Sequence, residues 1–291
     1  MSFDLLLVGV ASGVLVGLVL ALVSTGFNLS LGVSRVVNFQ HGGMVLWSMY
    51  GAYFVWAWTG SSLNPYVTAL VLVPLAFAFG YALHRLLVIR SLSTLEDSQI
   101  LFSIGLLIAM QYLAQFMFST DALSLPAEQL QGSLIVGPVI LQYSQLAAGG
   151  AALVVMMALH WMLAHTDLGR YLHACAQNPT GARVSGLNVE HLSGIAMGIA
   201  AACAAISGIA LVTLAPVFPE RAFEYAILSV VVSVLGGMGS MTGSILGGLL
   251  VGVILSVCQA FGYGAIAQAI VYGLVFVVFL VRPTGLVGSK A

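Results

Sequence analysis

The sequence predicts an all-α polytopic membrane protein with about eight transmembrane segments, in a range of seven to nine. Of its 291 residues, 60% are hydrophobic and only 6% are charged, and the mean hydropathy is +1.09. Soluble domains carry roughly 25% charged residues, so lipid must be the solvent for most of this chain. A β-barrel is disfavoured because its strands alternate apolar and polar residues, whereas these runs are apolar on every side.

Uncharged stretches locate the segments. No Asp, Glu, Lys or Arg occurs between Asp4 and Arg35, or between Arg35 and Arg85. A membrane helix needs about 20 consecutive apolar residues, so these two gaps hold one and two passes. In a single transmembrane domain over residues 1–291 we expect helices near 5–31, 44–59, 65–88, 99–119, 140–163, 193–213, 225–260 (interrupted) and 264–281.

Basic residues predict the orientation, because Lys and Arg are retained on the cytoplasmic side. The loops 85–97 and 164–192 and the C-terminus are predicted inside, and 120–138 and 214–224 outside. Arg221 breaks this pattern but lies between two glutamates, Glu220 and Glu224. The basic residues that mark the inner side are Arg85, Arg90, Arg170, Arg183, Arg282 and Lys290.

The 57 uncharged residues between Glu224 and Arg282 require an odd number of crossings. Either three short passes or one pass with a re-entrant hairpin satisfies this. The break falls in 236–243, where four glycines remove side chains from the helix: Gly236, Gly237, Gly239 and Gly243. Broken helices are tolerated in membranes only where protein or a cavity satisfies the backbone.

Glycines also recur at four-residue spacing, which lets helix backbones approach closely. We interpret this spacing as tight packing within the chain rather than a role in moving solute. The glycines are Gly9, Gly13 and Gly17 in the first helix, and Gly239, Gly243, Gly247, Gly248 and Gly252 near the C-terminus.

The loop 164–192 contains the signals of a short separate helix over 179–185. Asn178 is a good N-cap, Pro179 fits the first helical position, and Gly186 suits a left-handed residue after the last turn. Such a helix is either a solvated connector or a docking element for a cytoplasmic partner, with Ala182 and Val184 packing and Arg183 pairing.

A polar segment separates the first two apolar runs. Three polar residues fall within four positions: Asn38, Gln40 and His41. Phe39 lies between the first two, and Gly42 and Gly43 follow. At membrane depth these groups are costly unless they line something wet, and transporters place binding sites beside interrupted helices. The alternative is an ordinary cytoplasmic turn. We predict glycine-broken or re-entrant helices near 33–43 and 236–243.

Four motifs together resemble the branched-chain amino acid ABC transporter permeases of the LivH type, in the expected order over nearly the whole chain. They are Asn38-Phe39-x-His41-Gly42 followed by Gly51-Ala52-Tyr53; Gly169-Arg170 to Ala176-x-Asn178-Pro179-x-x-Ala182 and Gly186-Leu-Asn188; 235–243 with Gly247-Gly248; and 282–286. The family usually has a small residue at Gln40 and an acidic one at Gly43. The solute therefore stays open between branched-chain amino acids, amides, urea and small aromatic acids.

The resemblance implies a permease in the cell inner membrane that pairs with a second, related permease, two cytoplasmic ABC ATPases and an external solute-binding protein. It assigns coupling to the ATPases to the helix near 179–185, with Arg170, Asn178, Pro179, Ala182, Arg183 and Gly186. We expect the glycine breaks at 42–43 and 236–243 to act as hinges of the translocation path, together with Asn38, Phe39, Gln40 and His41.

Residue use separates the other function classes. A phosphate-binding Walker loop needs a lysine, and the only lysine is Lys290, so ATP and Mg²⁺ are expected to be used by partner ATPases and no cofactor by this chain. The net charge of −1 and the lack of a basic stripe argue against nucleic acid. A self-sufficient secondary transporter or channel is the alternative, although the predicted helices hold almost no ionisable groups. An intramembrane enzyme is disfavoured because HExxH and HxxxH are absent.

Overall fold

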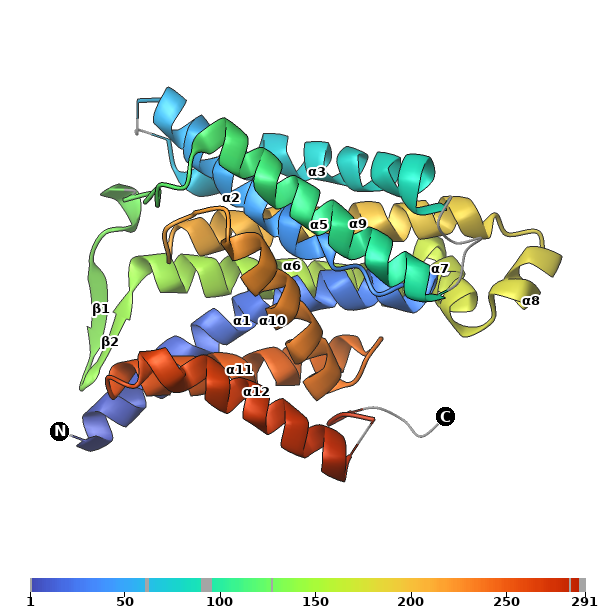
Figure 1. Ribbon diagram of the computed structural model, residues 1–291. Helices are drawn as coiled ribbons and strands as arrows, with labels where there is room; N and C mark the ends of the chain where they lie inside the picture. Colours follow the sequence, from blue (N-terminus) through green and yellow to red (C-terminus); the bar gives the residue numbers. More distant parts are fainter. Residues whose placement is uncertain (1, 61–62, 90–95, 127, 283, 288–291) are drawn as a thin grey trace.

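The computed structural model describes residues 2–60, 63–89, 96–126, 128–282 and 284–287, and most of them are helical (Figure 1). Seven described helices are long and apolar enough to cross a membrane, so the predicted class and the range of seven to nine segments are confirmed. The long helices are α1 (Ser2–Ser34), α2 (Gln40–Trp58), α3 (Ala69–Leu83), α5 (Glu96–Phe118), α6 (Tyr143–His165), α9 (Val189–Val212), α10 (Arg221–Gly236), α11 (Met241–Ala260) and α12 (Gly264–Val281).

Shorter elements connect them. The 3₁₀ helix η1 (Pro65–Thr68) precedes α3, and the π-helical turn η2 (His84–Val88) follows it. Helices α7 (Asp167–Gln177) and α8 (Pro179–Val184) lie between α6 and α9, and η3 (Glu128–Leu130) precedes a hairpin of β1 (Ser133–Val136) and β2 (Val139–Gln142).

The bundle has two distinct ends. At one, which we call the α8 end, lie α7, α8 and the C-terminal ends of α1, α3 and α12 (Figure 1). At the other, the hairpin end, β2 lies against the start of α1, and Leu123 forms a backbone bridge to Val217. The predicted inner loops thus share one end and the predicted outer loops share the other.

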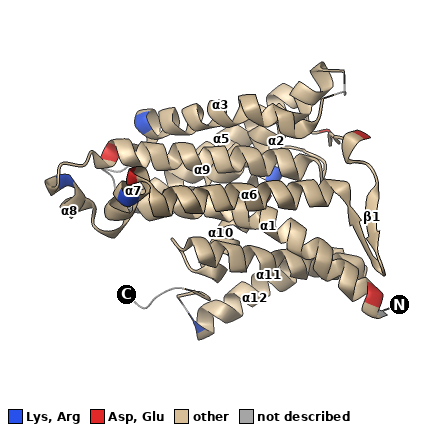
Figure 2. Ribbon diagram, turned by 180° about the vertical axis from the view of Figure 1, so that it is seen from behind, with Lys and Arg blue, Asp and Glu red and all other residues tan. Residues whose placement is uncertain are grey.

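Charge follows the same division (Figure 2). Arg85 lies in η2, Arg170 in α7 and Arg183 in α8, all at the α8 end. Arg221 is at the start of α10 and pairs with Glu224 at 2.6 Å, as its flanking glutamates suggest. Arg90 and Lys290 lie outside the described residues.

The region after Glu224 forms three consecutive helices, α10, α11 and α12, that run in alternating directions (Figure 1). Three helices are present, as the first of the two predicted arrangements requires, but only α11 and α12 are among the seven that are long and apolar enough to cross a membrane. Helix α10 has only 16 residues and α11 has 20, and the glycine break forms the turn between them.

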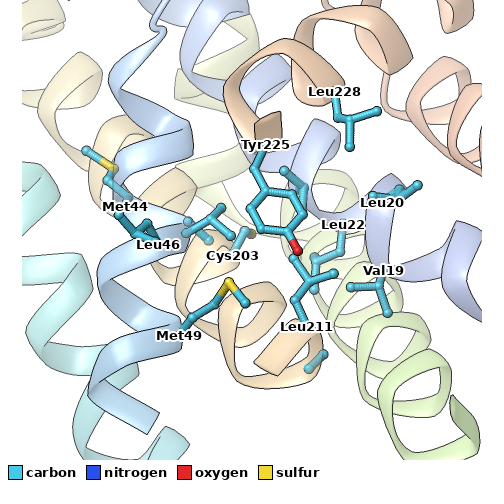
Figure 3. Packing of buried hydrophobic residues seen from close by; sticks show 14 of the residues in the cluster. Val19, Leu20, Leu22, Met44, Leu46, Met49, Cys203, Leu211, Tyr225 and Leu228 are labelled. Carbon is cyan, nitrogen blue, oxygen red and sulfur yellow. The ribbon is translucent and has the colours of Figure 1, made fainter. Parts of the chain in front are cut away.

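The glycine spacing serves packing within the chain, as predicted, except at Gly239, where an added Cβ would have nothing within 4 Å. A Cβ added to Gly13 would lie 2.5 Å from the Cα of Val253, and one added to Gly17 would lie 2.8 Å from the carbonyl oxygen of Gly248. Helices α1 and α11 therefore cross backbone against backbone. Beside this crossing, Tyr225 of α10 is buried among apolar side chains of α1, α2 and α9 (Figure 3).

The hairpin β1–β2 was not predicted. We expected an irregular loop over 120–138 and a helix from 140, but the helix begins at Tyr143. The segment 133–142 is rich in Ile, Val and Leu, which favour strands, and Gly137 has φ 60°, as the tight turn between the strands requires. The two antiparallel strands pair the backbone groups that face each other.

Candidate functional site

The polar segment after α1 folds back beside that helix and is not an ordinary surface turn. The chain leaves α1 at Arg35, whose φ is 57°, and α2 begins at Gln40. His41 Nε2 lies 2.9 Å from the carbonyl oxygen of Val23. Val23 precedes the end of α1 by eleven residues, or about 16 Å at 1.5 Å per residue. We call residues 35–41 the polar bend.

Three polar atoms in the polar bend are buried without a partner among the described residues: Asn38 Oδ1, Gln40 Oε1 and His41 Nδ1. The Asn38 amide reaches only a sulfur, Met197 Sδ at 3.0 Å. Such groups are costly to bury, so native proteins usually keep them where water or a ligand can reach. Asn38 and Gln40 line a cavity of about 10 Å³, enough for one water molecule.

The glycines that follow allow α2 to meet two other helices. A Cβ on Gly42 would fall against the Ala222 carbonyl oxygen and 2.6 Å from the Ala226 Cβ, both in α10. A Cβ on Gly43 would lie 2.9 Å from Met110 Sδ in α5. Phe39, the residue before α2, is partly buried against the main core. The start of α2 is therefore fixed by close contact with α10 and α5.

The glycine break joins α10 to α11 through left-handed backbone. Gly237 has φ 113° and Gly239 has φ 78°, values that favour glycine. Gly236 and Gly243 touch backbone to backbone, and a Cβ on either would overlap the carbonyl group of the other. Ser240 caps α11 by accepting from the Gly243 N–H at 3.0 Å.

Asn28 of α1, which was not among the predicted site residues, hydrogen-bonds to both helices that flank this break and to the break itself. Its Oδ1 accepts from the Ser233 hydroxyl of α10 and from the Gly239 N–H at 3.1 Å. Its Nδ2 donates to Ser244 Oγ of α11 at 2.6 Å. The available signal was an amide in an otherwise uncharged run from Asp4 to Arg35, but its partners lie more than 200 residues away.

The C-terminal segment completes the break. Leu286 N–H donates to the Leu235 carbonyl at 2.9 Å, and Val287 N–H donates to the Gly236 carbonyl at 3.0 Å. These carbonyls end α10 and have no partner within the helix. Gly285, at φ 77°, approaches Gly237 so closely that a Cβ would lie 2.6 Å from its nitrogen. Residues 285–287, which overlap the end of the motif 282–286, thus cap α10.

Helices α7 and α8 are built from local capping signals. Thr166 Oγ1 accepts from the Gly169 N–H at 3.2 Å and starts α7. Asn178 Oδ1 accepts from the Gly181 N–H at 2.9 Å, and Pro179 occupies the first helical position of α8. Gly186 closes α8 at φ 85°. The short helix and its three capping residues are those that the sequence predicts.

The two faces of α8 differ. Ala182 was expected to pack against a partner, but it is buried in the chain's own small core with Leu172 and Val189. This expectation was wrong, because a six-residue helix needs its apolar side to hold it to the protein. Arg183 and Val184 are exposed, Val184 by 85%. Arg170 on α7 is exposed and paired with Asp167.

A known protein family matches this chain over most of its length. The model of the family described as "Branched-chain amino acid transport system / permease component" matches residues 9–280. The chain belongs to this family.

Curated relatives agree with the family. The permease is 26% identical over 293 residues to the high-affinity branched-chain amino acid transport system permease protein BraD of Pseudomonas aeruginosa, covering 95% of this chain and 94% of the relative. It is 25% identical to the corresponding protein LivH of Escherichia coli K12, with the same coverage. The ribose import permease protein RbsC of Escherichia coli K12 matches 85 residues at 34% identity, or 29% of this chain and 26% of the relative. No solved structure matches.

In the permease, the polar bend and the α7–α8 region meet. Arg35 Nη2 donates to the carbonyl oxygens of Ala176 and Gln177, both at 3.2 Å, directly before the cap of α8. These contacts join residues 141 and 142 positions apart and were not predicted from the sequence. No cluster of three or more His, Cys, Asp or Glu side chains that could hold a metal occurs in the described part of the chain. Burial raises the pKa of the Cys175 thiol beneath α8.

Proposed function

We propose that this permease is the membrane-spanning subunit of a binding-protein-dependent ABC importer. It moves branched-chain amino acids or a similar small solute across the inner membrane, and separate ATPase subunits hydrolyse the ATP with Mg²⁺. A second, related permease and an external solute-binding protein complete the complex. The observation that carries this proposal is α8, a fully capped helix that projects beyond the bundle in a member of this permease family (Figure 1).

The α8 end faces the cytoplasm in this proposal. Arg35, Arg85 and Arg170 lie there, as does Arg183, and Arg282 follows α12. Retention of basic residues on the cytoplasmic side supports this orientation, which puts the C-terminus inside and the hairpin outside. The exposed side chains of α8 then meet the ATPases.

The polar bend is the part of the translocation path that this permease contributes. Its unpartnered groups on Asn38, Gln40 and His41 offer hydrogen bonds to a solute or to water within the bundle. We propose that the helices pivot at the glycine break in 236–243, whereas Gly42 and Gly43 lie inside the continuous helix α2, so the break expected at 42–43 is not present. In this proposal the partner ATPases bind ATP, and the permease opens and closes the translocation path.

The experiment that tests this function is purification of the tagged permease from its native membranes in mild detergent. Recovery of a second permease and of ATPase subunits is expected. The recovered complex, placed in liposomes, should accumulate solute only with ATP and the binding protein. A permease that purifies alone and moves solute without ATP would contradict the proposal.

The polar bend can be tested separately. Asn38→Ala and His41→Ala should each lower uptake by about tenfold, because a lost hydrogen bond to a solute costs about 1–2 kcal/mol. Ser207→Ala is the control, since this buried hydroxyl bonds only to the Cys203 carbonyl of its own helix at 2.8 Å. ATPase subunits should still co-purify. If they do not, Asn38 and His41 are structural residues.

A further inference from the structure

The C-terminal end of α1 packs in the small buried cluster that also holds α8. Val33 lies in one buried cluster with Leu172 of α7, Ala182 of α8 and Val189 of α9. Displacing α8 would therefore disturb the last turn of α1. This apolar contact alone is adaptable, because small shifts of aliphatic side chains can absorb movement without transmitting it.

Arg35 adds a directed contact next to this cluster. Its Nη2 reaches the Ala176 and Gln177 carbonyls, each at 3.2 Å. These carbonyls close α7, where the helix dipole places partial negative charge and the backbone lacks helical partners. The following residue, Asn178, is the N-cap of α8. The Arg35 guanidinium is thus hydrogen-bonded to the junction between α7 and α8.

The backbone of Arg35 is equally specific. Its φ of 57° is rare for a residue with a Cβ, and it turns the chain out of α1 and into the polar bend. Six residues later, His41 is held to the Val23 carbonyl of α1. The polar bend is therefore attached at two points, to the α7–α8 junction through Arg35 and to the interior of the bundle through His41.

We infer that Arg35 is the positioning residue that passes a displacement of α8 to the polar bend. The inference rests on the proposed function, in which the ATPases move α8. When the ATPases move α8, the hydrogen bonds from Arg35 to the Ala176 and Gln177 carbonyls move the start of the polar bend as well. The groups on Asn38 and Gln40, which lie between the two attachments, then shift relative to α1, so ATP hydrolysis and access to the path are coupled.

The same contacts would also form if Arg35 only capped α7, but Arg35 variants would then behave differently. The Arg35 side chain is exposed, and the Val33 cluster remains without it, so its loss should leave the fold intact. If Arg35 only caps α7, uptake and ATP hydrolysis should change together or not at all. If it transmits movement, hydrolysis should continue while uptake falls.

The test uses the complete importer in liposomes and measures solute taken up per ATP hydrolysed. Arg35→Gln should lower that ratio about tenfold, while ATP hydrolysis stays within about twofold of the unaltered complex. Arg35→Lys keeps the charge but loses the planar guanidinium, so its uptake per ATP should lie between that of Arg35→Gln and that of the unaltered complex. Arg85→Gln, the same change on another exposed arginine at the same end of the bundle, should leave the ratio unchanged.

Two results would overturn the inference: an unchanged ratio in Arg35→Gln, or losses of uptake in both Arg35 variants that only match a lower amount of assembled complex. Either leaves the proposed function standing if the unaltered complex still needs ATP. If the unaltered complex takes up solute without ATP, the proposed function itself fails.

Discussion

Gly252→Val is expected to prevent the permease from folding. A Cβ at Gly252 would fall against Gly17 and 2.6 Å from the Gly13 carbonyl oxygen, so the added atoms meet backbone on α1. Overpacking against movable side chains costs about 1–3 kcal/mol, and here no side chain can move aside, so the cost should exceed that range. The amount of monodisperse permease extracted in detergent should fall at least about tenfold.

The control is Gly273→Val in α12, where an added Cβ has nothing within 4 Å. It carries the same change in helix propensity and in volume, and should extract normally. Size-exclusion chromatography and thermal unfolding of both variants give the measurement. A stable Gly252→Val permease would mean that α1 and α11 do not cross at these glycines.

Gly186→Pro is expected to abolish uptake without reducing the amount of permease in the membrane. Proline fixes φ near −65°, whereas Gly186 has φ 85° and its N–H donates to the Arg183 carbonyl at 3.0 Å. The substitution therefore unwinds the end of α8, which lies outside the bundle. Because α8 is the proposed contact with the ATPases, transport should fall to background.

Gly186→Asn is the matched control, since asparagine tolerates the left-handed region, and uptake should be largely kept. Arg183→Glu tests the same surface by charge reversal on an exposed side chain and should also abolish uptake, with Arg183→Lys as its control. Radiolabelled solute uptake and immunoblotting of membranes measure transport and abundance. Normal transport by Gly186→Pro and by Arg183→Glu would exclude α8 as the coupling element.

Features that depend on neighbours in the chain could be predicted from sequence. Apolar runs placed the membrane helices, and the first, predicted near 5–31, is α1 at Ser2–Ser34. Asn178, Pro179 and Gly186 predicted α8 because each acts on backbone groups within three or four residues. The glycine spacing predicted close packing because a bare helix face follows directly from periodicity. The hairpin at 133–142 was missed because a short apolar run fits a strand or a helix start equally well.

The sequence by itself determined that this chain is built of apolar helices suited to a membrane, roughly where most of them run, and that a short capped helix follows Asn178. Tertiary structure alone decided that Asn28 ties the glycine break together, that residues 285–287 cap α10, and that Arg35 grips the end of α7. It also turned Ala182 inward. The physical reason is distance along the chain: a helix cap is satisfied within one turn, whereas Arg35 and Ala176 are 141 residues apart and meet only after the helices have packed.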